Sequence, residues 1–359
     1  MNLRIPGPTP LPDDVLQAMS RQMIDHRGPE FEALHRDVIA WLKVFFETQS
    51  DLYILTSSGT GAMEAAIVNT CSPGDRVLAV SVGVFGKRFG TIASRHGVDV
   101  TWMNVTMGQA ADPQELAERL RADGPFKAVL ITQNETSTGV TNPMAELCAV
   151  VRAVDPAPLL IVDAISGLGA IRLPQDEWGV DVVVAGSQKA WMAPPGVAFI
   201  SFSTRAWQAY ETARCHRYYF DLGEARRYGA RNQTPSTPNI PALYALHVSL
   251  AAMVEEGPEA VQARHQAIAD YCRKGVEAIG AHLYAAEGCR SNTVTALTLP
   301  EGIDTGRVLE RLRTDYGIVC ATGRDPSVEM IRIGHMGYVT ESDLAAVFGA
   351  MRHIMEEMM

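Results

Sequence analysis

Residues 159–163 read Leu159-Leu160-Ile161-Val162-Asp163, a short apolar run that ends in a carboxylate. A second run of this kind covers residues 181–185 and is followed by Gly186-Ser187-Gln188-Lys189. Apolar runs without alternation are typical of strands that are covered on both faces of a parallel sheet. The two runs therefore predict buried strands, each followed by an ionisable side chain at its carboxyl end.

Runs of the same type recur through the first two thirds of the chain and alternate with helical periodicity. The apolar runs cover residues 52–55, 76–80, 98–103, 127–132 and 197–202. Helical spacing covers residues 15–23, 31–45, 61–69, 113–121 and 143–154. Strands that alternate with helices favour an α/β fold, in which helices cover both faces of a mostly parallel sheet.

The pattern changes near Pro238, after which the chain is helical from about residue 240 to 280, with a break at Gly257-Pro258. Strand patterns then cover residues 293–299, 318–321 and 330–333, and helical patterns cover residues 308–315 and 342–355. We expect a large domain over residues 15–254 and a smaller α+β domain over residues 255–359. No low-complexity linker separates them, so the two domains should pack together.

The composition excludes several classes of protein. The chain has 359 residues, 47% of them hydrophobic, and a formal net charge of −10. A general nucleic-acid binder would need a clustered excess of Lys and Arg. No apolar run approaches the ~20 residues of a membrane span, and the N-terminus lacks an apolar signal core. The six dispersed cysteines form no C-x-x-C pair, which argues against a zinc cluster or disulfides. We expect a cytoplasmic protein with no metal, membrane or nucleic-acid partner.

A candidate anion site follows the first apolar run, where Ser58-Gly59-Thr60-Gly61 opens a helix. Free backbone N–H groups and the helix dipole favour an anion there, most often phosphate. An ordinary helix cap by Ser58 or Thr60 is the alternative interpretation. The segment is not a P-loop, because no Gly-Lys-Ser/Thr follows. Glu64, at the third position of a dinucleotide fingerprint, disfavours a nicotinamide dehydrogenase.

Asp163 and Lys189 each follow a buried strand, where an unpaired charge is costly. Asp163 is expected to face a cation or a cofactor nitrogen, unless it is a solvated or capping residue. Partial burial lowers the pKa of a lysine, and a neutral amine can form a Schiff base. A Lys189 that extends into solvent is the alternative. A phosphate site, a carboxylate and a lysine in this order are what pyridoxal 5′-phosphate requires.

Further motifs run through the whole chain in a consistent order and spacing. They are Pro6-Gly7-Pro8-Thr9-Pro10, Ser58-Gly59-Thr60, Asn134-Glu135-Thr136-Ser137-Thr138-Gly139, Val162-Asp163, Gly186-Ser187-Gln188-Lys189, Thr234-Pro235-Ser236-Thr237-Pro238 and Arg332-Ile333-Gly334-His335-Met336-Gly337. With these motifs the chain resembles the class V group of fold-type I pyridoxal-phosphate aminotransferases. The resemblance is to the alanine–glyoxylate and serine–pyruvate (serine–glyoxylate) branch.

The resemblance implies roles for the residues around the cofactor. Lys189 would form the Schiff base and move the proton of the substrate's α-carbon, and Asp163 would pair with the pyridinium nitrogen. The phosphate would be held by Ser58, Gly59, Thr60 and Gln188. Because of the likeness to the family, we expect Thr136 near the 3′-hydroxyl of the ring.

Two further roles concern the substrate and the ring face. Arg332 would bind the substrate carboxylate through a bidentate pair. Gly7 would line the substrate site, so that residues 1–14 form an N-terminal segment along it. Phe85 stands where relatives often carry a Trp that stacks on the ring, and it can still stack.

The resemblance also implies a homodimer, because relatives bring a Tyr and a Thr from the neighbouring subunit to the phosphate. Thr237 matches that Thr, but Thr234 stands where the Tyr would be. This departure puts the strength of the neighbour's phosphate contact in doubt.

We therefore expect a transaminase that moves the amino group of alanine or serine to glyoxylate or pyruvate by a ping-pong mechanism. No second arginine has a clear claim on a side-chain carboxylate, which favours small neutral donors. One alternative is a lyase or desulfurase on the same fold; the run around Cys320 reads as a strand and lacks a basic loop, which opposes it. Aminophosphonate or ureido-type donors and a non-catalytic subunit are further alternatives.

Overall fold

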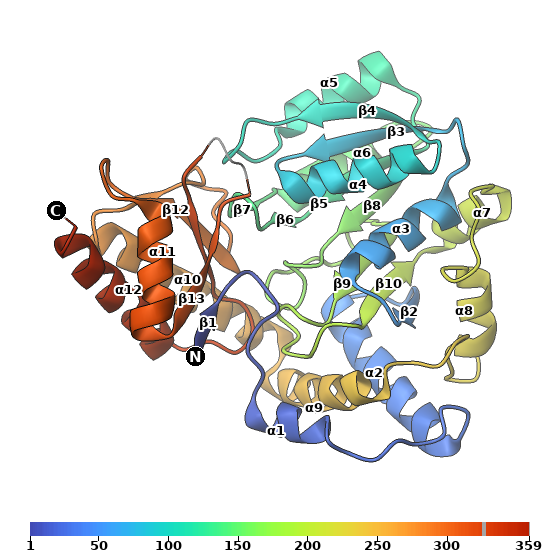
Figure 1. Cartoon of the computed structure of the whole chain (residues 1–359). Helices are drawn as coiled ribbons and strands as arrows, with labels where there is room; N and C mark the ends of the chain where they lie inside the picture. Colours follow the sequence, from blue (N-terminus) through green and yellow to red (C-terminus); the bar gives the residue numbers. More distant parts are fainter. Residues whose placement is uncertain (325–327, 359) are drawn as a thin grey trace.

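The computed structural model describes residues 1–324 and 328–358, which form two large β-sheets with helices packed against each, and a two-stranded hairpin (Figure 1). The seven-stranded sheet has the order β2-β10-β9-β8-β5-β3-β4. Its strands are β2 (Asp51–Leu55), β3 (Arg76–Ser81), β4 (Asp99–Asn104), β5 (Ala128–Thr132), β8 (Leu159–Asp163), β9 (Val182–Gly186) and β10 (Ala198–Phe202). Only β10 pairs antiparallel with its neighbours, so the prediction of a mostly parallel sheet is confirmed.

Helices cover both faces of this sheet because successive strand residues point to opposite sides. On β8, Leu160 and Val162 enter one hydrophobic cluster, whereas Leu159 and Ile161 enter the other. The first cluster is covered by α1 (Asp13–Ala18), α2 (Pro29–Phe46), α5 (Pro113–Asp123), α6 (Met144–Arg152) and α9 (Ile240–Glu256). The second is covered by α3 (Gly59–Thr70), α4 (Val84–Arg95), α7 (Thr204–Thr212) and α8 (Leu222–Gly229).

The five-stranded sheet has the order β1-β13-β14-β12-β11 and packs against three helices. Its strands are β1 (Asn2–Arg4), β11 (His282–Leu283), β12 (Val294–Thr298), β13 (Ile318–Thr322) and β14 (Ile331–Gly334), and its helices are α10 (Pro258–Ala278), α11 (Thr305–Tyr316) and α12 (Glu341–Glu356). A short hairpin of β6 (Asn134–Glu135) and β7 (Val140–Thr141) completes the strands.

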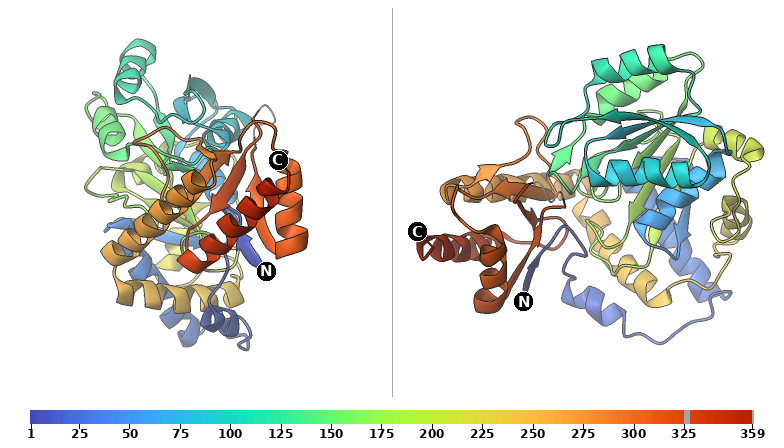
Figure 2. Two further views of the ribbon diagram at one scale, coloured as in Figure 1. Left: turned by 90° about the vertical axis from the view of Figure 1, so that its left-hand side faces the viewer. Right: turned by 45° about the horizontal axis from the view of Figure 1, so that its top comes forward.

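The N-terminal strand β1 pairs in parallel with β13, so the first residues of the chain join the sheet of its last third (Figure 2). Asn2 lies opposite Ile318 and Arg4 opposite Cys320. Nothing in the sequence pattern predicted this pairing, because a strand of three residues is too short for a recognisable period.

The helix expected over residues 15–23 is shorter than its apolar spacing indicated. It ends at Ala18, and Met23 lies outside it with half of its surface exposed. The break expected at Gly257-Pro258 is present between α9 and α10. Gly257 adopts φ +87°, a backbone conformation that residues with a side chain rarely adopt. Pro258 then starts the next helix.

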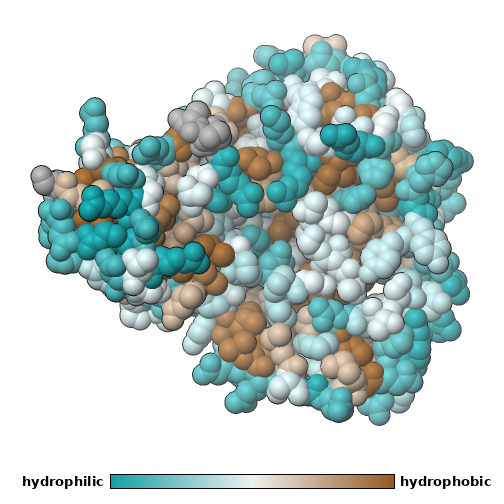
Figure 3. Space-filling view, viewed as in Figure 1, coloured by the Kyte–Doolittle hydropathy of each residue, from teal (hydrophilic) through white to brown (hydrophobic). Residues whose placement is uncertain are grey.

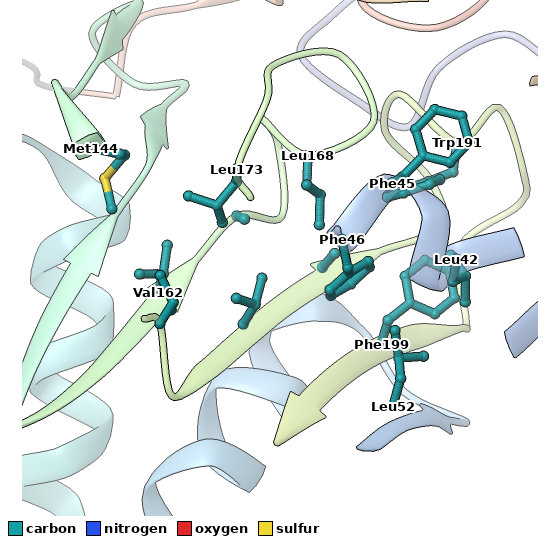
Figure 4. Close-up of a cluster of buried hydrophobic side chains, with 14 of the residues drawn as sticks. Leu42, Phe45, Phe46, Leu52, Met144, Val162, Leu168, Leu173, Trp191 and Phe199 are labelled. Carbon is teal, nitrogen blue, oxygen red and sulfur yellow. The ribbon is translucent and has the colours of Figure 1, made fainter. Parts of the chain in front are cut away.

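A group of aromatic rings anchors the segment after β9 (Figure 4). Trp191 is fully buried between Phe45, Phe46 and Phe199, with ring centroids 5.6–6.3 Å away. Ser249 on α9 also donates a 2.5 Å hydrogen bond to the Trp191 carbonyl. Because Lys189 lies two residues before Trp191, this packing fixes the backbone that carries its side chain.

The face seen in Figure 3 is mostly hydrophilic, with apolar residues in separate patches. Within residues 1–324 and 328–358, no helix combines the length and the apolar character that a membrane crossing demands.

Candidate active site

The carboxyl ends of β2, β8 and β9 meet at one edge of the seven-stranded sheet and open into a cavity of about 110 Å³. This is where a doubly wound sheet places its ligands. Its lining contains Ser58, Gly59, Thr60, Met63, Phe85, Arg88, Asn134, Thr136, Asp163, Ile165, Ser166, Gln188 and Lys189. Residues that are 131 positions apart in the sequence, such as Ser58 and Lys189, thus share one pocket.

Asp163 ends β8 and is 3% exposed. Its carboxylate accepts a 3.0 Å hydrogen bond from the Ile165 N–H and a 3.4 Å bond from the Thr132 hydroxyl. Burial raises the pKa of Asp163 to about 7, and the nearby charge of Glu135 acts in the same direction. No ion pair within the described part of the chain includes Asp163. A bound cationic group would therefore stabilise the charged form of its carboxylate.

Lys189 follows β9 and directs its amine into the same cavity. Its Nζ donates a hydrogen bond to the Pro6 carbonyl. Burial lowers the pKa of Lys189 to about 8, while the Asp163 carboxylate opposes that shift. The arginines Arg332, Arg324 and Arg88 lower the same pKa further. A lysine with such a pKa has a substantial neutral, nucleophilic fraction near neutral pH.

The N-terminus of α3 forms the anion-binding end of the cavity. Ser58 is the N-cap residue, but no side chain caps the first turn of the helix. The Thr60 hydroxyl accepts a 3.1 Å hydrogen bond from Arg88. A Cβ built on Gly59 would come within 2.6 Å of Ile165, so a larger residue would close this end. Unsatisfied helix N–H groups beside an arginine suit a phosphate.

Glu135 is completely buried and binds the start of α4. Its carboxylate accepts hydrogen bonds from the backbone N–H groups of Phe85 at 2.8 Å and Gly86 at 3.2 Å. Its other oxygen accepts from the Ser137 hydroxyl at 2.6 Å. Glu135 therefore occupies the N-terminus of α4 and fixes the helix that carries Phe85 and Arg88.

Arg332 lies on β14, 5% exposed, and reaches from the five-stranded sheet to the cavity wall. Its Nε donates to the Thr322 carbonyl at 2.9 Å, and its Nη1 donates to the Thr136 carbonyl at 3.0 Å. Burial, followed by the charge of Arg324, lowers the pKa of Arg332 to about 10. These contacts orient the guanidinium plane while leaving Nη2 for an anion.

The structure brings most of the residues expected from the sequence into one place. Ser58, Gly59, Thr60, Phe85, Thr136, Asp163, Gln188 and Lys189 line the cavity. Gly7 lies beside Lys189, since a Cβ at Gly7 would be 2.6 Å from Nζ. Thr237 does not join this lining and is exposed on the surface. Thr234 is buried, and its hydroxyl donates to the Ser236 carbonyl at 2.8 Å.

Two residues of the site, Arg88 and Glu135, were not predicted from the sequence. Arg88 is one helical turn after Phe85, so a prediction of α4 would have placed both on one face. Glu135 belongs to a motif that was singled out, but only the structure reveals that its carboxylate holds α4.

The residues present fit pyridoxal 5′-phosphate. The α3 N-terminus with Arg88 can hold a phosphate, Asp163 can hold a protonated ring nitrogen, and Lys189 presents an amine. Gln188 also lines the cavity, where its side-chain N–H groups could donate to a phosphate.

Comparison with known proteins agrees with this geometry. A family model described as aminotransferase class-V matches residues 1–347. A Paracoccus denitrificans protein named L-aspartate–glyoxylate aminotransferase is 40% identical over 346 residues, which are 94% of this chain and 87% of that protein. A Synechococcus protein named as the small subunit of a soluble hydrogenase is also 40% identical, over 99% of this chain and 93% of that protein.

Among solved structures, an alanine–glyoxylate aminotransferase from a Nostoc species superposes with a TM-score of 0.94 at 29% identity. The match covers 98% of this chain and 94% of the Nostoc chain, so the overall fold corresponds.

Proposed function

The chain belongs to the class-V aminotransferases, and on that premise we propose that it transfers the amino group of a small amino acid to a small 2-oxo acid. The donor would be alanine or serine and the acceptor glyoxylate or pyruvate, with pyridoxal 5′-phosphate as cofactor. Glyoxylate as acceptor is supported by the names of the Paracoccus and Nostoc proteins. The observation that carries the proposal is the Lys189 amine in one cavity with Asp163 and the α3 N-terminus.

Each residue has a chemical task in this proposal. When bound, pyridoxal phosphate supplies an aldehyde that accepts the amino group and a ring that withdraws electrons from the substrate's Cα. Asp163 holds the ring nitrogen protonated, which keeps the ring electron-poor. Lys189 Nζ would take the proton from the substrate's Cα and hold it for transfer. Arg332 holds the substrate carboxylate, and Ser58, Gly59, Thr60, Gln188 and Arg88 hold the phosphate.

We also propose that the active unit is a homodimer in the cytoplasm. Thr237 is exposed in a single chain and matches a family residue that reaches the neighbour's phosphate. Tyr218 is 93% exposed, and the adjacent Tyr219 donates to the Thr56 carbonyl beside the anion-binding end. Residues 15–254 and 255–359 would act as two domains, with residues 1–14 covering the site between them.

A non-catalytic subunit is the second candidate, because one relative is named as a hydrogenase subunit. The intact set of Lys189, Asp163 and Arg332 supports the enzyme over this candidate. A lyase or desulfurase, or a transaminase for aminophosphonate or ureido-type donors, would use the same cavity.

Initial-rate kinetics test the proposal. When alanine or serine is varied at several fixed concentrations of glyoxylate, a ping-pong enzyme gives parallel double-reciprocal lines. Glycine accumulates as the product of glyoxylate. Lys189→Ala should reduce turnover by at least ~10²-fold, because the group that moves the proton is lost. Undiminished turnover of Lys189→Ala would overturn the assignment.

A further inference from the structure

Two arginines from different parts of the chain flank the ring of Phe85. The guanidinium carbon of Arg88, on the same helix as Phe85, lies 4.7 Å from the ring centroid. The guanidinium carbon of Arg324 lies 5.5 Å from the same centroid. Arg324 follows β13 of the five-stranded sheet, so its side chain bridges to α4 of the seven-stranded sheet. Phe85 and Arg88 line the cavity, and Arg324 lies outside this lining, next to it through its contact with Phe85.

The three arginines of the site have different surroundings. Arg88 donates to the Thr60 hydroxyl and is therefore directed to the anion-binding end. Arg332 is buried and held by the carbonyls of Thr322 and Thr136, which directs it to the α-carboxylate of a substrate. Arg324 lies two residues beyond Thr322, on the same hairpin as Arg332, and is exposed to solvent. Of Arg324 and Arg332, Arg324 is therefore the one nearer to solvent.

The described carboxylates near this group of cations act on it without forming ion pairs: Glu135 raises the pKa of Arg332, and Asp163 raises that of Lys189. Within the described residues, no ion pair includes Arg88, Arg324 or Arg332. The charge of Arg324 lowers the pKa of both Arg332 and Lys189, so the groups are close enough to repel one another. Anions that bind among them relieve this repulsion. The cofactor's phosphate and the substrate's α-carboxylate account for Arg88 and Arg332, which leaves Arg324.

We propose that Arg324 binds a second carboxylate, so that the enzyme accepts a four-carbon amino dicarboxylate such as aspartate as donor. This inference rests on the proposed function and specifies its substrate class. Transfer of the amino group from aspartate to glyoxylate yields oxaloacetate and glycine, and no further reactant is needed. The planar guanidinium suits a carboxylate better than an ammonium would.

This inference changes the expectation that small neutral donors are favoured over aspartate or glutamate. Arg324 carried no signal in the sequence, because nothing there indicates that the residue after Gly323 reaches Phe85. The fold supplies the missing information by placing Arg324, two residues after β13, beside the ring of Phe85 at the start of α4.

The test compares aspartate with asparagine, which has nearly the same shape without the charge. In wild-type holoenzyme with glyoxylate as acceptor, kcat/KM for aspartate should exceed that for asparagine by at least ~10-fold. In Arg324→Gln the ratio should fall by about 10-fold or more, and Arg324→Lys should restore part of it. Arg313→Gln, which removes an exposed arginine on α11, is the matched control and should keep the wild-type ratio.

A binding measurement gives a readout that does not depend on turnover. Calorimetry of the holoenzyme with succinate and with butyrate compares a dicarboxylate with a monocarboxylate of equal length. Succinate should bind at least ~10-fold more tightly to wild type and lose this advantage in Arg324→Gln.

The outcomes separate this inference from the proposed function. Turnover of alanine or serine with an aspartate-to-asparagine ratio that Arg324→Gln leaves unchanged would overturn the inference alone. Failure of every amino donor, aspartate included, would overturn the proposed function itself.

Discussion

Gly7 lies directly against the amine of Lys189: a Cβ built on Gly7 would come within 2.6 Å of Nζ and 2.9 Å of Cδ. The carbonyl of the preceding residue, Pro6, accepts a hydrogen bond from the same amine. The segment that makes these contacts follows β1, which is paired with β13. The five-stranded sheet therefore positions the chain that covers the lysine of the other sheet.

Gly7→Ala should impair the enzyme more than the loss of one hydrogen bond would. The new methyl group must displace Lys189, and φ +119° strains any residue with a side chain. We expect kcat to fall by about 10-fold or more, measured in steady-state assays with saturating cofactor. Gly302→Ala is the matched control, since Gly302 has φ +88° but no atom near its Cβ position. Equal activity of both variants would contradict the assigned contact.

Asp163→Asn should lower transaminase activity and raise the stability of the cofactor-free protein relative to wild type at higher pH. Burial raises the pKa of Asp163 to about 7, above its ordinary value of 3.8. Between these values the folded state retains a proton that the unfolded state has released, so this carboxyl destabilises the cofactor-free protein as pH rises from about 4 to about 7. Asparagine does not titrate, so Asp163→Asn does not lose stability through this group as pH rises. Its free energy of unfolding relative to wild type should increase by more than ~1 kcal/mol between pH 5 and pH 8.

Urea unfolding of cofactor-free wild type and Asp163→Asn at both pH values measures this difference. Titrating groups that do not interact with Asp163, such as the buried histidines, cancel because both proteins contain them. The same variant should lose most of its transaminase activity, since an amide cannot hold the ring nitrogen protonated. A stability difference that does not change with pH would be inconsistent with an uncompensated buried carboxyl.

Arg332→Lys should weaken every substrate that has an α-carboxylate. A lysine keeps the charge but loses the bidentate geometry and the bonds to Thr136 and Thr322. We expect kcat/KM for alanine and for glyoxylate to fall by about 10- to 100-fold, mainly through KM. Equal KM values for variant and wild type would refute a carboxylate-binding role, whereas an effect on only one of the two substrates would assign Arg332 to that substrate alone.

Cys320→Ala should leave transamination within about twofold of wild type. Cys320 lies on β13, and burial raises the pKa of its thiol to about 12, so the reactive thiolate is absent near neutral pH. A desulfurase would instead depend on a reactive cysteine. Sulfide release from cysteine that disappears in Cys320→Ala would favour that alternative reaction.

The strand pattern was sufficient to predict where Asp163 and Lys189 meet. Both follow apolar runs, and parallel strands end at the same edge of a sheet. The structure confirms the α/β fold and brings both side chains into one cavity. The local pattern works here because burial on both faces demands an uninterrupted apolar sequence.

Contacts between distant segments were beyond that pattern. Helix α4 was not among the predicted helices, although one of its faces is buried; there Gly86 and Gly90 pack closely against Ser81 and Trp102. The pairing of β1 with β13 and the reach of Arg324 to Phe85 depend on how the two sheets pack. Such contacts leave no periodic signal in a single sequence.

The absorption spectrum of the purified protein tests the central claim most directly. With pyridoxal phosphate held by Lys189, wild type should show a yellow band that alanine, serine or aspartate bleaches and that glyoxylate restores. Lys189→Ala should not show this bleach-and-restore cycle at a comparable rate. A wild-type protein that shows no such band even after pyridoxal phosphate is added would contradict the account and favour the non-catalytic subunit.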